Sequence, residues 1–262
     1  MRRFFVPPEN LHNDPPEVTG PEAVHIAAVL RLKEGDAVIL FDGTGCEYDA
    51  VILSATKKRV AFQVSGKRRK PAASFIPVTI AQALLKERKM DLVARQLAEL
   101  GIVSLIPFSA ERCVARIDSE RTRHRRKRWE KIVREAMKQC KRNTAMVIGE
   151  IMSFDDILAL GDRFDHRILF WEKADTPFHP HRRETKEEPG PVIAVLGPEG
   201  GFSDKEAAHA AKAGFIPVSL GPLILKSETA AVAAAALLQY LFGNLFPLGV
   251  KGLEKPEIGG QE

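Results

Sequence analysis

Two loops rich in glycine and proline lie near the C-terminus, and their residue types are suited to binding a small ligand. The first loop, GPEGG (197–201), directly follows the apolar run VIAVL. The second begins with Gly221-Pro222 after FIPVSL and continues as LILKSETA. Glycine lets backbone N–H and C=O groups come close to a ligand, and proline keeps a loop rigid. Such loops favour a flat polar molecule, such as adenine, held by backbone hydrogen bonds.

The spacing of the first loop argues against the common nucleotide-binding motifs. Its glycines follow the pattern G-x-x-G-G, whereas the dinucleotide fingerprint is G-x-G-x-x-G with an acid about 20 residues further on. Pro217 stands at that position here, and the chain has no Walker A sequence. The sequence therefore disfavours NAD and ATP. Two tight turns without a ligand are the alternative, which carries less weight for two adjacent Gly-Pro loops than for one.

The elements around these loops predict an α/β domain. From about residue 74, apolar runs of strand length alternate with helical patterns, which is typical of a largely parallel sheet covered on both faces. In such sheets ligands bind beyond the carboxyl ends of the strands, so we expect both loops at one edge. Ser203 and Glu206 predict a capping box, and Ser227 or a neighbour is expected to cap the final helix. Strands are expected at 78–85, 102–107, 146–151, 167–172, 192–197 and 215–221, and long helices at 87–100, 121–140 and 230–242.

Residues 1–70 predict a separate unit that is rich in strands. A short helix is expected at Pro21–Leu30, and an Asp42-Gly43 turn indicates a hairpin or meander. A unit of this size is expected to close as a barrel or a compact sandwich. KRRKPAAS (67–74) is predicted to be a linker, because charge and proline discourage a helix and a central strand. The strand candidates are AVILFD (37–42), CEYDAVILS (46–54) and RVAFQVS (59–65).

Positive charge is concentrated in two segments. Between Arg112 and Arg128 there are eight lysines and arginines against two acids, a net +6, while the whole chain carries +5. A second basic run, Lys67–Lys70, precedes Pro71. Localised charge of this kind suits a phosphate backbone, so the pattern favours RNA or DNA as a partner. A solvated helix face is the alternative interpretation.

The remaining composition favours a cytoplasmic protein without a metal. No apolar run approaches the roughly 20 residues of a membrane span, and the N-terminus lacks the apolar core of a signal peptide. The three cysteines, Cys46, Cys113 and Cys140, are odd in number and widely spaced, which fits neither a disulfide framework nor a zinc site. His179 and His181 lie two residues apart in a proline-rich segment, which is better explained as a solvated loop.

The final predicted helix carries many small side chains. Ala230, Ala231 and Ala233–Ala236 leave little side-chain bulk, so the helix can pack closely against another backbone. That backbone can belong to the same domain or to a second copy across a dimer interface. The high helix propensity of alanine is an alternative explanation.

GPEGGFSDKE followed by SLGPLILKSETA resembles the C-terminal motif of the SPOUT-class methyltransferases, and more narrowly that of the ribosomal RNA small-subunit methyltransferase E family. Several further segments are similar to that family in order and spacing, and the similarity extends to about residue 245. These segments are MRRFFV, HIAAVLRLKEGDAVILFDGTGCEYDA, KERKMDLVARQLAELGIVSLIPFSAERC and RWEKIVREAMKQCKRN.

The resemblance implies a fold, a reaction and partners. The expected fold is α/β, with an N-terminal PUA-like β-barrel at residues 1–72 and a C-terminal SPOUT α/β domain with a trefoil knot at 73–246. A disordered tail is expected at 247–262. The family methylates N3 of a uridine in 16S ribosomal RNA with S-adenosylmethionine (SAM) and works as a homodimer. The expected partners are therefore small-subunit ribosomal RNA, free or in the assembled 30S particle, and a second copy of the chain.

Carried over to this chain, the resemblance implies that both loops hold SAM. The family usually has arginines where this chain has Leu223 and Lys226, threonine where it has Ser227, and often lysine where it has Gln96. Lys226 keeps the charge of arginine but not its planar fork. The residues expected to bind SAM are Leu196, Gly197, Pro198, Glu199, Gly200, Gly201, Leu220, Gly221, Leu225, Lys226, Ser227, Glu228 and Thr229.

Methylation at N3 requires that the uracil loses its N3 proton. Glu228 is a candidate base, and Arg142 is a candidate to stabilise the anion or hold a phosphate. The alternatives are an acid stabilised by a helix N-terminus and a surface arginine. Two other functions remain open, which are methylation of another RNA such as tRNA and RNA binding without catalysis. Arginines and lysines expected to bind RNA are Arg2, Arg3, Arg112, Arg121, Arg123, Arg125, Arg126, Lys127 and Arg128.

Overall fold

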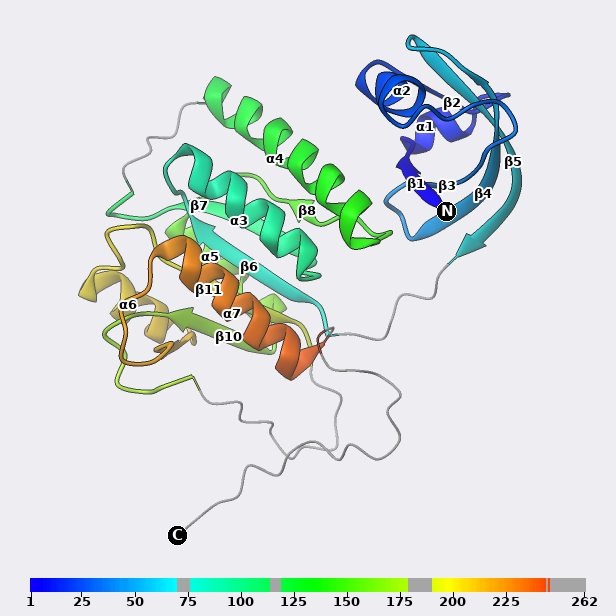
Figure 1. The fold of residues 1–262 in the computed structure, drawn as a ribbon. Helices are drawn as coiled ribbons and strands as arrows, with labels where there is room; N and C mark the ends of the chain where they lie inside the picture. Colours follow the sequence, from blue (N-terminus) through cyan, green and yellow to red (C-terminus); the bar gives the residue numbers. More distant parts are fainter. Residues whose placement is uncertain (70–75, 114–118, 179–189, 244, 246–262) are drawn as a thin grey trace, which may run out of the picture.

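The computed structural model describes residues 1–69, 76–113, 119–178, 190–243 and 245. The chain forms two sheets, a five-stranded sheet from its first 69 residues and a seven-stranded sheet from the rest (Figure 1). The expected boundary at residues 72 and 73, His179, His181 and the expected tail at 247–262 lie outside the described residues.

The N-terminal sheet is a strongly curved unit with the strand order β1-β3-β4-β5-β2 (Figure 1). Strands β3 (Ala37–Phe41), β4 (Cys46–Ala55) and β5 (Arg59–Arg69) form the predicted antiparallel meander. Strand β1 (Arg2–Phe5) adds to β3 in parallel, and β2 (Glu17–Thr19) adds to β5. Helices α1 (Pro8–Leu11) and α2 (Pro21–Val24) accompany the sheet, and α2 continues as a π-turn at His25–Val29. The core of this N-terminal unit includes Phe4, Val6, Val18, Ile26, Leu40 and Phe62.

The predicted linker at 67–74 is wrong for its first residues, because Lys67, Arg68 and Arg69 are the end of β5. There they pair with Cys46–Tyr48 of β4. The other neighbour of β5, strand β2, pairs only as far as Ala61, so this part of β5 is an edge where charged side chains reach water. Lys67 Nζ lies 5.5 Å from the centre of the Tyr48 ring, which adds a cation–π contact.

The Asp42-Gly43 turn holds a small hydrogen-bond network. The buried Asp42 carboxylate accepts hydrogen bonds from Thr44 N at 2.8 Å, Thr44 Oγ1 at 2.7 Å and Tyr48 Oη at 3.0 Å. Burial by itself works toward a higher pKa for Asp42, but the hydrogen bonds from Thr44 and Tyr48 outweigh it and lower the pKa. Burial, together with the hydrogen bond to Asp42 and its charge, raises the pKa of Tyr48 to about 12.

Tyr48 should therefore make the fold sensitive to alkali. An unfolded tyrosine ionises near its ordinary pKa of 10.0 and the folded Tyr48 near 12, so the unfolded state loses its proton first and stability falls as the pH rises between these values. We expect phenolate absorbance in a Tyr240→Phe variant, which removes the other of the two tyrosines, to appear with a midpoint near 12. Asp42→Asn should lower that midpoint; a midpoint already near 10 with Asp42 present would contradict the network.

The C-terminal sheet is parallel throughout, with the order β12-β10-β11-β6-β7-β8 and β9 also paired with β7. The two central strands are buried along their whole length, as expected for a sheet covered on both faces. The predicted strand at 146–151 keeps only Val147–Ile148, with a second short strand after it, and the one at 215–221 keeps three residues. The strands are β6 (Val78–Ala83), β7 (Ser104–Ser109), β8 (Val147–Ile148), β9 (Met152–Ser153), β10 (His166–Phe170), β11 (Val192–Leu196) and β12 (Ile216–Val218).

Helices cover both faces of this sheet. On one face α3 (Glu87–Glu99), α4 (Ser119–Cys140) and α7 (Ser227–Phe242) enclose a core that includes Val93, Trp129 and Ala234 (Figure 1). On the other face lie α5 (Phe154–Ala159), a 3₁₀ turn at Leu160–Arg163 and α6 (Asp204–Lys212). Their core contains Phe108, Phe154 and Phe202 in mutual ring contact. The prediction of a parallel sheet between two helical layers is confirmed.

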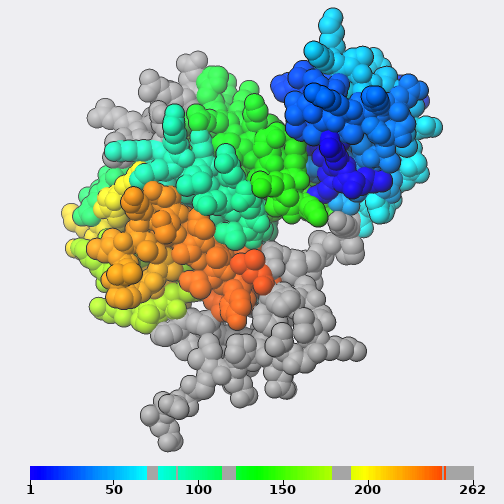
Figure 2. All heavy atoms as spheres, in the orientation of Figure 1, coloured from blue at the N-terminus to red at the C-terminus, as the bar shows by residue number. Residues whose placement is uncertain are grey.

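The N-terminal unit contacts the rest of the protein at the C-terminal end of α4 (Figure 2). Gly45 N donates to Asn143 O at 3.0 Å, and Ala145 N donates to Gly43 O at 2.9 Å. Lys138 of α4 pairs with Glu22 at 2.5 Å. Among the described residues no helix is long and apolar enough to cross a membrane.

Candidate functional site

The carboxyl ends of four parallel strands meet at one edge of the C-terminal sheet. Gln82 of β6 lies opposite Leu196 of β11, Leu196 opposite Phe170 of β10, and Phe170 opposite Val218 of β12. The loop at 197–203, the loop at 219–226 and the short 84–86 connection after β6 therefore start at the same edge of the sheet, with β10 between the strands that lead into the two loops. The expectation that both glycine loops lie at one edge is confirmed.

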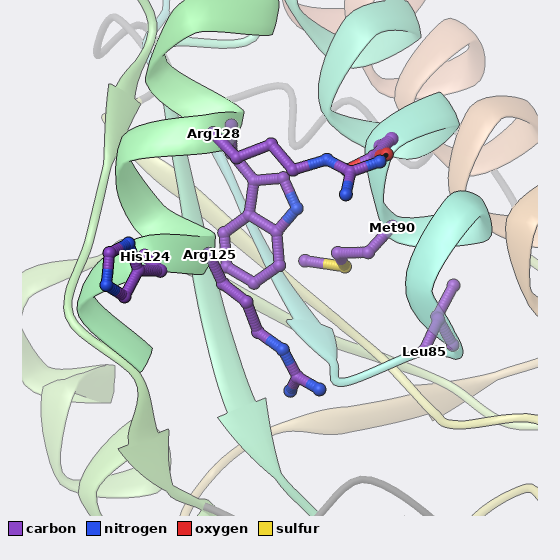
Figure 3. Close-up of a pocket in the computed structure, with 7 residues that line it drawn as sticks. Leu85, Met90, His124, Arg125 and Arg128 are labelled. Atoms are coloured by element: carbon purple, nitrogen blue, oxygen red, sulfur yellow. Dashed lines mark hydrogen bonds and ion pairs between the residues drawn. The ribbon is translucent and has the colours of Figure 1, made fainter. Parts of the chain in front are cut away.

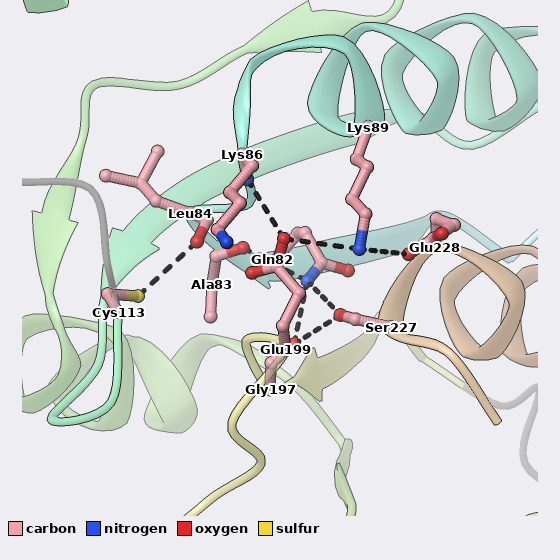
Figure 4. A network of polar contacts seen from close by, with 10 residues as sticks. All are labelled: Gln82, Ala83, Leu84, Lys86, Lys89, Cys113, Gly197, Glu199, Ser227 and Glu228. Carbon is pink, nitrogen blue, oxygen red and sulfur yellow. Dashed lines mark hydrogen bonds and ion pairs between the residues drawn. The ribbon is translucent and has the colours of Figure 1, made fainter. Parts of the chain in front are cut away.

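Gln82, near the end of β6, links the two loops. Its side chain is fully buried, and its Nε2 donates to Gly197 O at 3.0 Å and to Ala83 O at 3.1 Å, with Ser227 Oγ at 3.3 Å (Figure 4). Its Oε1 is buried and has no hydrogen-bond partner among the described residues. Leaving such an acceptor unpaired costs about 1–3 kcal/mol, so the junction is arranged around an acceptor that a ligand or water can satisfy.

Ser227 ties the second loop to the first instead of capping the final helix. The predicted cap is wrong, because α7 begins at Ser227 itself and Lys226 occupies the N-cap position without a side-chain cap hydrogen bond to any described residue. The Ser227 hydroxyl donates to Gly197 O at 2.6 Å (Figure 4). The carbonyl of Gly197 thus receives hydrogen bonds from both Gln82 and Ser227, which fixes the distance between the loops.

Lys89 of α3 joins a carboxylate from each loop. Its Nζ lies 3.4 Å from Glu199 Oε1 and 3.3 Å from Glu228 Oε2 (Figure 4). Loss of hydration works against the charged lysine, but Glu228 and then Glu199 outweigh it and raise the pKa of Lys89. Burial works toward a higher pKa for Glu199, but its hydrogen bond from Lys86 N at 3.1 Å and the contact with Lys89 lower the pKa. Both carboxylates are therefore held at the N-terminus of α3.

The first loop is braced on its other side by the segment after β7. Arg112 donates to Gly200 O at 3.1 Å, and a Cβ on Gly200 would lie 3.0 Å from the Arg112 Cβ, so the close approach requires glycine. Glu111 N donates to Glu206 Oε1 at 2.8 Å, and Ser203 Oγ donates to Glu111 Oε2 at 2.7 Å. The predicted capping box of Ser203 and Glu206 is present, and it also anchors this bracing segment.

The second loop is more open than the first. Gly221 has a φ of +110°, which an L side chain rarely adopts, and Leu223 and Ile224 are strongly exposed. Leu220 and Leu225 are half-buried, whereas Lys226 and Thr229 are exposed. Pro198 is buried below the first loop. The residues expected to bind SAM therefore form two backbone segments at the edge of the sheet. The carboxylates of Glu199 and Glu228 and the buried amide of Gln82 lie beside these segments.

This set of groups fits SAM better than it fits a metal. Glu199 and Glu228 supply negative charge that suits a sulfonium, the exposed Lys226 suits a carboxylate, and Gln82 Oε1 awaits a donor. The described residues contain no group of three or more side chains that could hold a metal ion. SAM would be held by the backbone of the two loops and by these few side chains.

Arg142 does not lie at this site. Its Nε donates to Thr144 O at 2.5 Å, and its Nη1 donates to Ile102 O at 2.7 Å and Ala98 O at 3.2 Å, at the C-terminal end of α3. Burial lowers the pKa of its guanidinium. Ala98 lies nine residues after Lys89 in α3, which corresponds to about 14 Å along the helix. Within one chain Arg142 therefore lies away from the two loops and donates to carbonyls near a helix end, and its catalytic role stays a prediction.

Arg142→Met should destabilise the fold by about 2–4 kcal/mol, because it removes the Arg142 hydrogen bonds to the carbonyls of Ile102, Thr144 and Ala98. Urea unfolding measures this loss. The control is Arg95→Met, which removes an exposed arginine of α3, and its free energy of unfolding should stay within about 0.5 kcal/mol of wild type. Methylation per folded molecule should be unchanged. A variant of normal stability that has lost methylation would support a catalytic role.

The arginines expected to bind RNA fall into different environments. Arg3 is held by Glu47 at 2.6 Å with its side chain only 9% exposed, so it supports the N-terminal sheet and offers little to a phosphate. Arg2 is exposed, and Arg112 braces the first glycine loop. On α4, Arg126 pairs with Glu130 and Glu150, whereas Arg123, Lys127 and Arg128 are exposed and Arg125 is half-buried. The side chain of Arg121 lies outside the described part of the chain.

Sequence reasoning missed Gln82, Lys89 and the Glu111 brace. One signal for Gln82 was available, since it is the most polar residue in the otherwise apolar and β-branched run VTIAQALL. Lys89 carried no such signal, because one lysine on a charged helix face is ordinary. Its partners come from residues more than 100 positions away, and only the sheet register brings them together.

Two family models match the chain. The RNA methyltransferase domain matches residues 72–239, which contain both glycine loops. The RNA methyltransferase PUA domain matches residues 18–65 of the N-terminal unit. The chain therefore combines a PUA-like domain with an RNA methyltransferase domain.

Curated relatives and solved structures agree with this division. Ribosomal RNA small subunit methyltransferase E of Bacillus subtilis is 29% identical over 92% of this chain and 96% of its own length. The protein of the same name from Buchnera aphidicola (subsp. Acyrthosiphon pisum) is 30% identical over 92% of this chain and 89% of its own. A methyltransferase from Legionella pneumophila, solved with bound SAM, has a TM-score of 0.81 and 30% identity over 90% of this chain and 96% of its own. The Neisseria gonorrhoeae ribosomal RNA small subunit methyltransferase E, bound to SAM, has a TM-score of 0.78 and 27% identity over 94% of this chain and all of its own.

Proposed function

The chain belongs to the ribosomal RNA small subunit methyltransferase E family, and we propose that its two glycine loops hold SAM beside the uridine that it methylates. The protein is a SAM-dependent ribosomal RNA methyltransferase that acts on N3 of a uridine in 16S ribosomal RNA. The observation that supports the proposed site is the junction of Gln82, Gly197 and Ser227, which holds both loops at the carboxyl edge of the sheet.

Release of the methyl group from SAM needs no acid or base from the protein. SAM supplies a methyl group on a sulfonium, whose displacement releases a neutral thioether. The protein therefore has to orient the two reactants, exclude water and accept the N3 proton. Backbone groups of the loops at 197–201 and 220–225 provide the orientation, and bracing by Arg112, Glu111 and Gln82 keeps these groups in place.

Glu228 is the proposed acceptor of the N3 proton. Its side chain is 16% exposed and faces the shared Lys89, at the start of α7 and beside the first loop. Its position beside Lys89 and at the N-terminus of α7 places the carboxylate at the edge where the two loops meet. Glu199 faces the same lysine but is also held by Lys86 N, so it is the more restrained of the two acids.

A C-terminal trefoil knot is proposed for the SPOUT domain. The segment after β10 runs beside the segment after β12, because Ser219 N donates to Thr176 O at 2.9 Å and Phe178 N donates to Ser219 O at 2.8 Å. The chain then leaves the edge strand β12 and returns to the middle of the sheet, where α7 packs on β6 and β11. A return of this kind past a neighbouring loop supports a threaded path.

A homodimer is proposed through the outer side of α7 and the loop before it. Leu223, Ile224 and Leu237 are exposed there, while the alanines Ala231, Ala234 and Ala235 face the core of the same chain. Exposed apolar side chains that cluster along one element are typical of an interface. Sedimentation equilibrium should give a dimer at micromolar concentration, and a monomer there would contradict this proposal.

The expected partner is small-subunit ribosomal RNA, free or within the 30S particle, in the cytoplasm. The exposed Arg2, Arg123, Lys127 and Arg128 support phosphate contacts, so binding should weaken steeply with salt. Methylation of another RNA such as tRNA and RNA binding without catalysis are the alternatives. Titration calorimetry with SAM tests the last of these, because an inert fold should bind none. Mass spectrometry of rRNA and tRNA nucleosides from a deletion strain identifies the substrate, and N3-methyluridine lost from tRNA alone would overturn the assignment to 16S ribosomal RNA.

A further inference from the structure

A cavity of about 500 Å³ lies between the first turns of α3 and the basic part of α4 (Figure 3). Its inner wall is apolar and consists of Leu85, Met90 and Trp129, which are all nearly fully buried. Its outer wall is polar, with Arg125, Arg128 and His124 on α4 and Asp91 on α3. The size lies within the usual range of about 300–1000 Å³ for pockets that bind small molecules or single groups.

The charges of the cavity favour a phosphate-bearing ligand with a flat ring. Arg128 forms an ion pair with Asp91, which offsets part of its charge, and Arg125 adds a second guanidinium on the next turn of the same wall. Guanidinium groups present planar forks to phosphate oxygens and also lie flat against bases. The apolar side chains of the inner wall expose only 1–3% of their surface, which suits the edge of a base, whereas an inorganic anion would gain nothing from them.

The cavity adjoins the proposed methylation site through two residues. Leu85 lines the cavity, and the next residue, Lys86, donates its backbone N–H to Glu199 of the first loop. Met90 of the wall directly follows Lys89, which pairs with Glu199 and Glu228. The cavity and the two loops therefore share the 84–86 connection and the first turn of α3.

We propose that this cavity binds an unpaired nucleotide of the RNA next to the uridine that is methylated. The edge of its base contacts the exposed part of Leu85, Met90 and Trp129, and its phosphate contacts Arg125 and Arg128. This inference rests on the proposed function of the two loops and assigns part of the RNA contact to a specific place. The other basic residues of α4 then act by general attraction of the RNA alone.

Matched variants of α4 distinguish a nucleotide site in the cavity from general attraction of RNA by positive charge. Arg125→Gln removes a positive charge from the wall of the cavity, and Arg123→Gln and Lys127→Gln remove the same charge from exposed positions of the same helix that do not line it. With an RNA substrate at fixed salt, we expect Arg125→Gln to lower kcat/KM by about tenfold or more and the two controls by no more than about threefold. SAM affinity by calorimetry and the melting temperature should be the same for all three.

A second measurement addresses the base. In a substrate RNA that is abasic at the position 5′ or 3′ of the methylated uridine, one of the two should lose the contact with the inner wall. For that RNA the loss caused by Arg125→Gln should become smaller than for the intact RNA, because both changes act on one bound nucleotide.

Equal losses in the three variants, or strictly additive effects with both abasic RNAs, would overturn the proposal and leave only a basic surface. A wild-type enzyme that binds SAM and methylates RNA keeps the proposed function in either case. A wild-type enzyme that binds no SAM would overturn the proposed function, and this inference with it.

Discussion

Glu228→Gln should lower the rate of methyl transfer by about 10²–10⁴-fold, the usual loss when a general base is removed. The amide keeps the size of the side chain but cannot accept the N3 proton from the uracil. Single-turnover methylation with saturating SAM measures this step alone. Because N3 loses its proton without help at high pH, the rate of the variant should keep rising with pH after that of wild type has levelled off.

Glu199→Gln is the matched control, because Glu199 contacts the same lysine but lies in the first loop. It should weaken SAM binding and leave the pH profile of the transfer step unchanged. Lys89→Met should resemble Glu199→Gln, with an added loss from two carboxylates left facing each other. If Glu228→Gln, Glu199→Gln and Lys89→Met gave the same loss with the same pH profile, Glu228 would be a partner of Lys89 and not a base.

Gln82→Leu should reduce SAM affinity by about tenfold or more. Leucine fills a similar volume, so it avoids a large cavity, but it removes the donor to Gly197 O and the acceptor Oε1 below the loops. The Ser227 hydroxyl and the Lys89 ion pairs then remain as the links between the loops. Calorimetry with SAM measures the affinity, and the effect should appear in KM for SAM more than in kcat with the cofactor saturating.

Thr79→Val is the control for this variant, because it also removes a buried polar group from β6 but lies near the other end of the strand. It should leave SAM affinity within about twofold of wild type. A Gln82→Leu protein that melts normally and binds SAM as wild type does would show that the two loops hold their spacing without Gln82. Gln82→Glu gives a second comparison, since a carboxylate at this place would face the Gly197 carbonyl with like partial charge.

Much of the C-terminal fold follows from local patterns. Strands buried on both faces read as continuous apolar runs, as in VIAVL, and helices carry apolar residues at helical spacing, as in α3. Local sequence patterns gave wrong strand bounds where a strand depends on pairing with another strand. The run MVIGEI keeps only Val147–Ile148 as a strand, because only these two of its residues pair with β7, and a second short strand, Met152–Ser153, follows the run. Lys67–Arg69 extend a strand because β4 supplies the pairing.

The candidate site shows the same division. The two loops were evident from their glycines and prolines, and the capping box from the spacing of Ser203 and Glu206. The role suggested for Arg142 stays a prediction, and the tertiary fold places its guanidinium against carbonyl groups near the end of α3, away from the two loops. Ser227 looked like a cap, yet the neighbouring loop offers its hydroxyl a carbonyl at 2.6 Å.

The sequence by itself determined which residues can form the loops, because the conformations of glycine and proline and the period of apolar residues are local properties of the chain. It also determined the concentration of positive charge on α4. Only the tertiary structure decided that Gln82, Gly197 and Ser227 meet, that Lys89 lies between Glu199 and Glu228, and that a cavity with an apolar wall opens beside Arg125. These contacts join residues that are far apart along the chain, and their geometry is set by the register of parallel strands, which no local pattern contains.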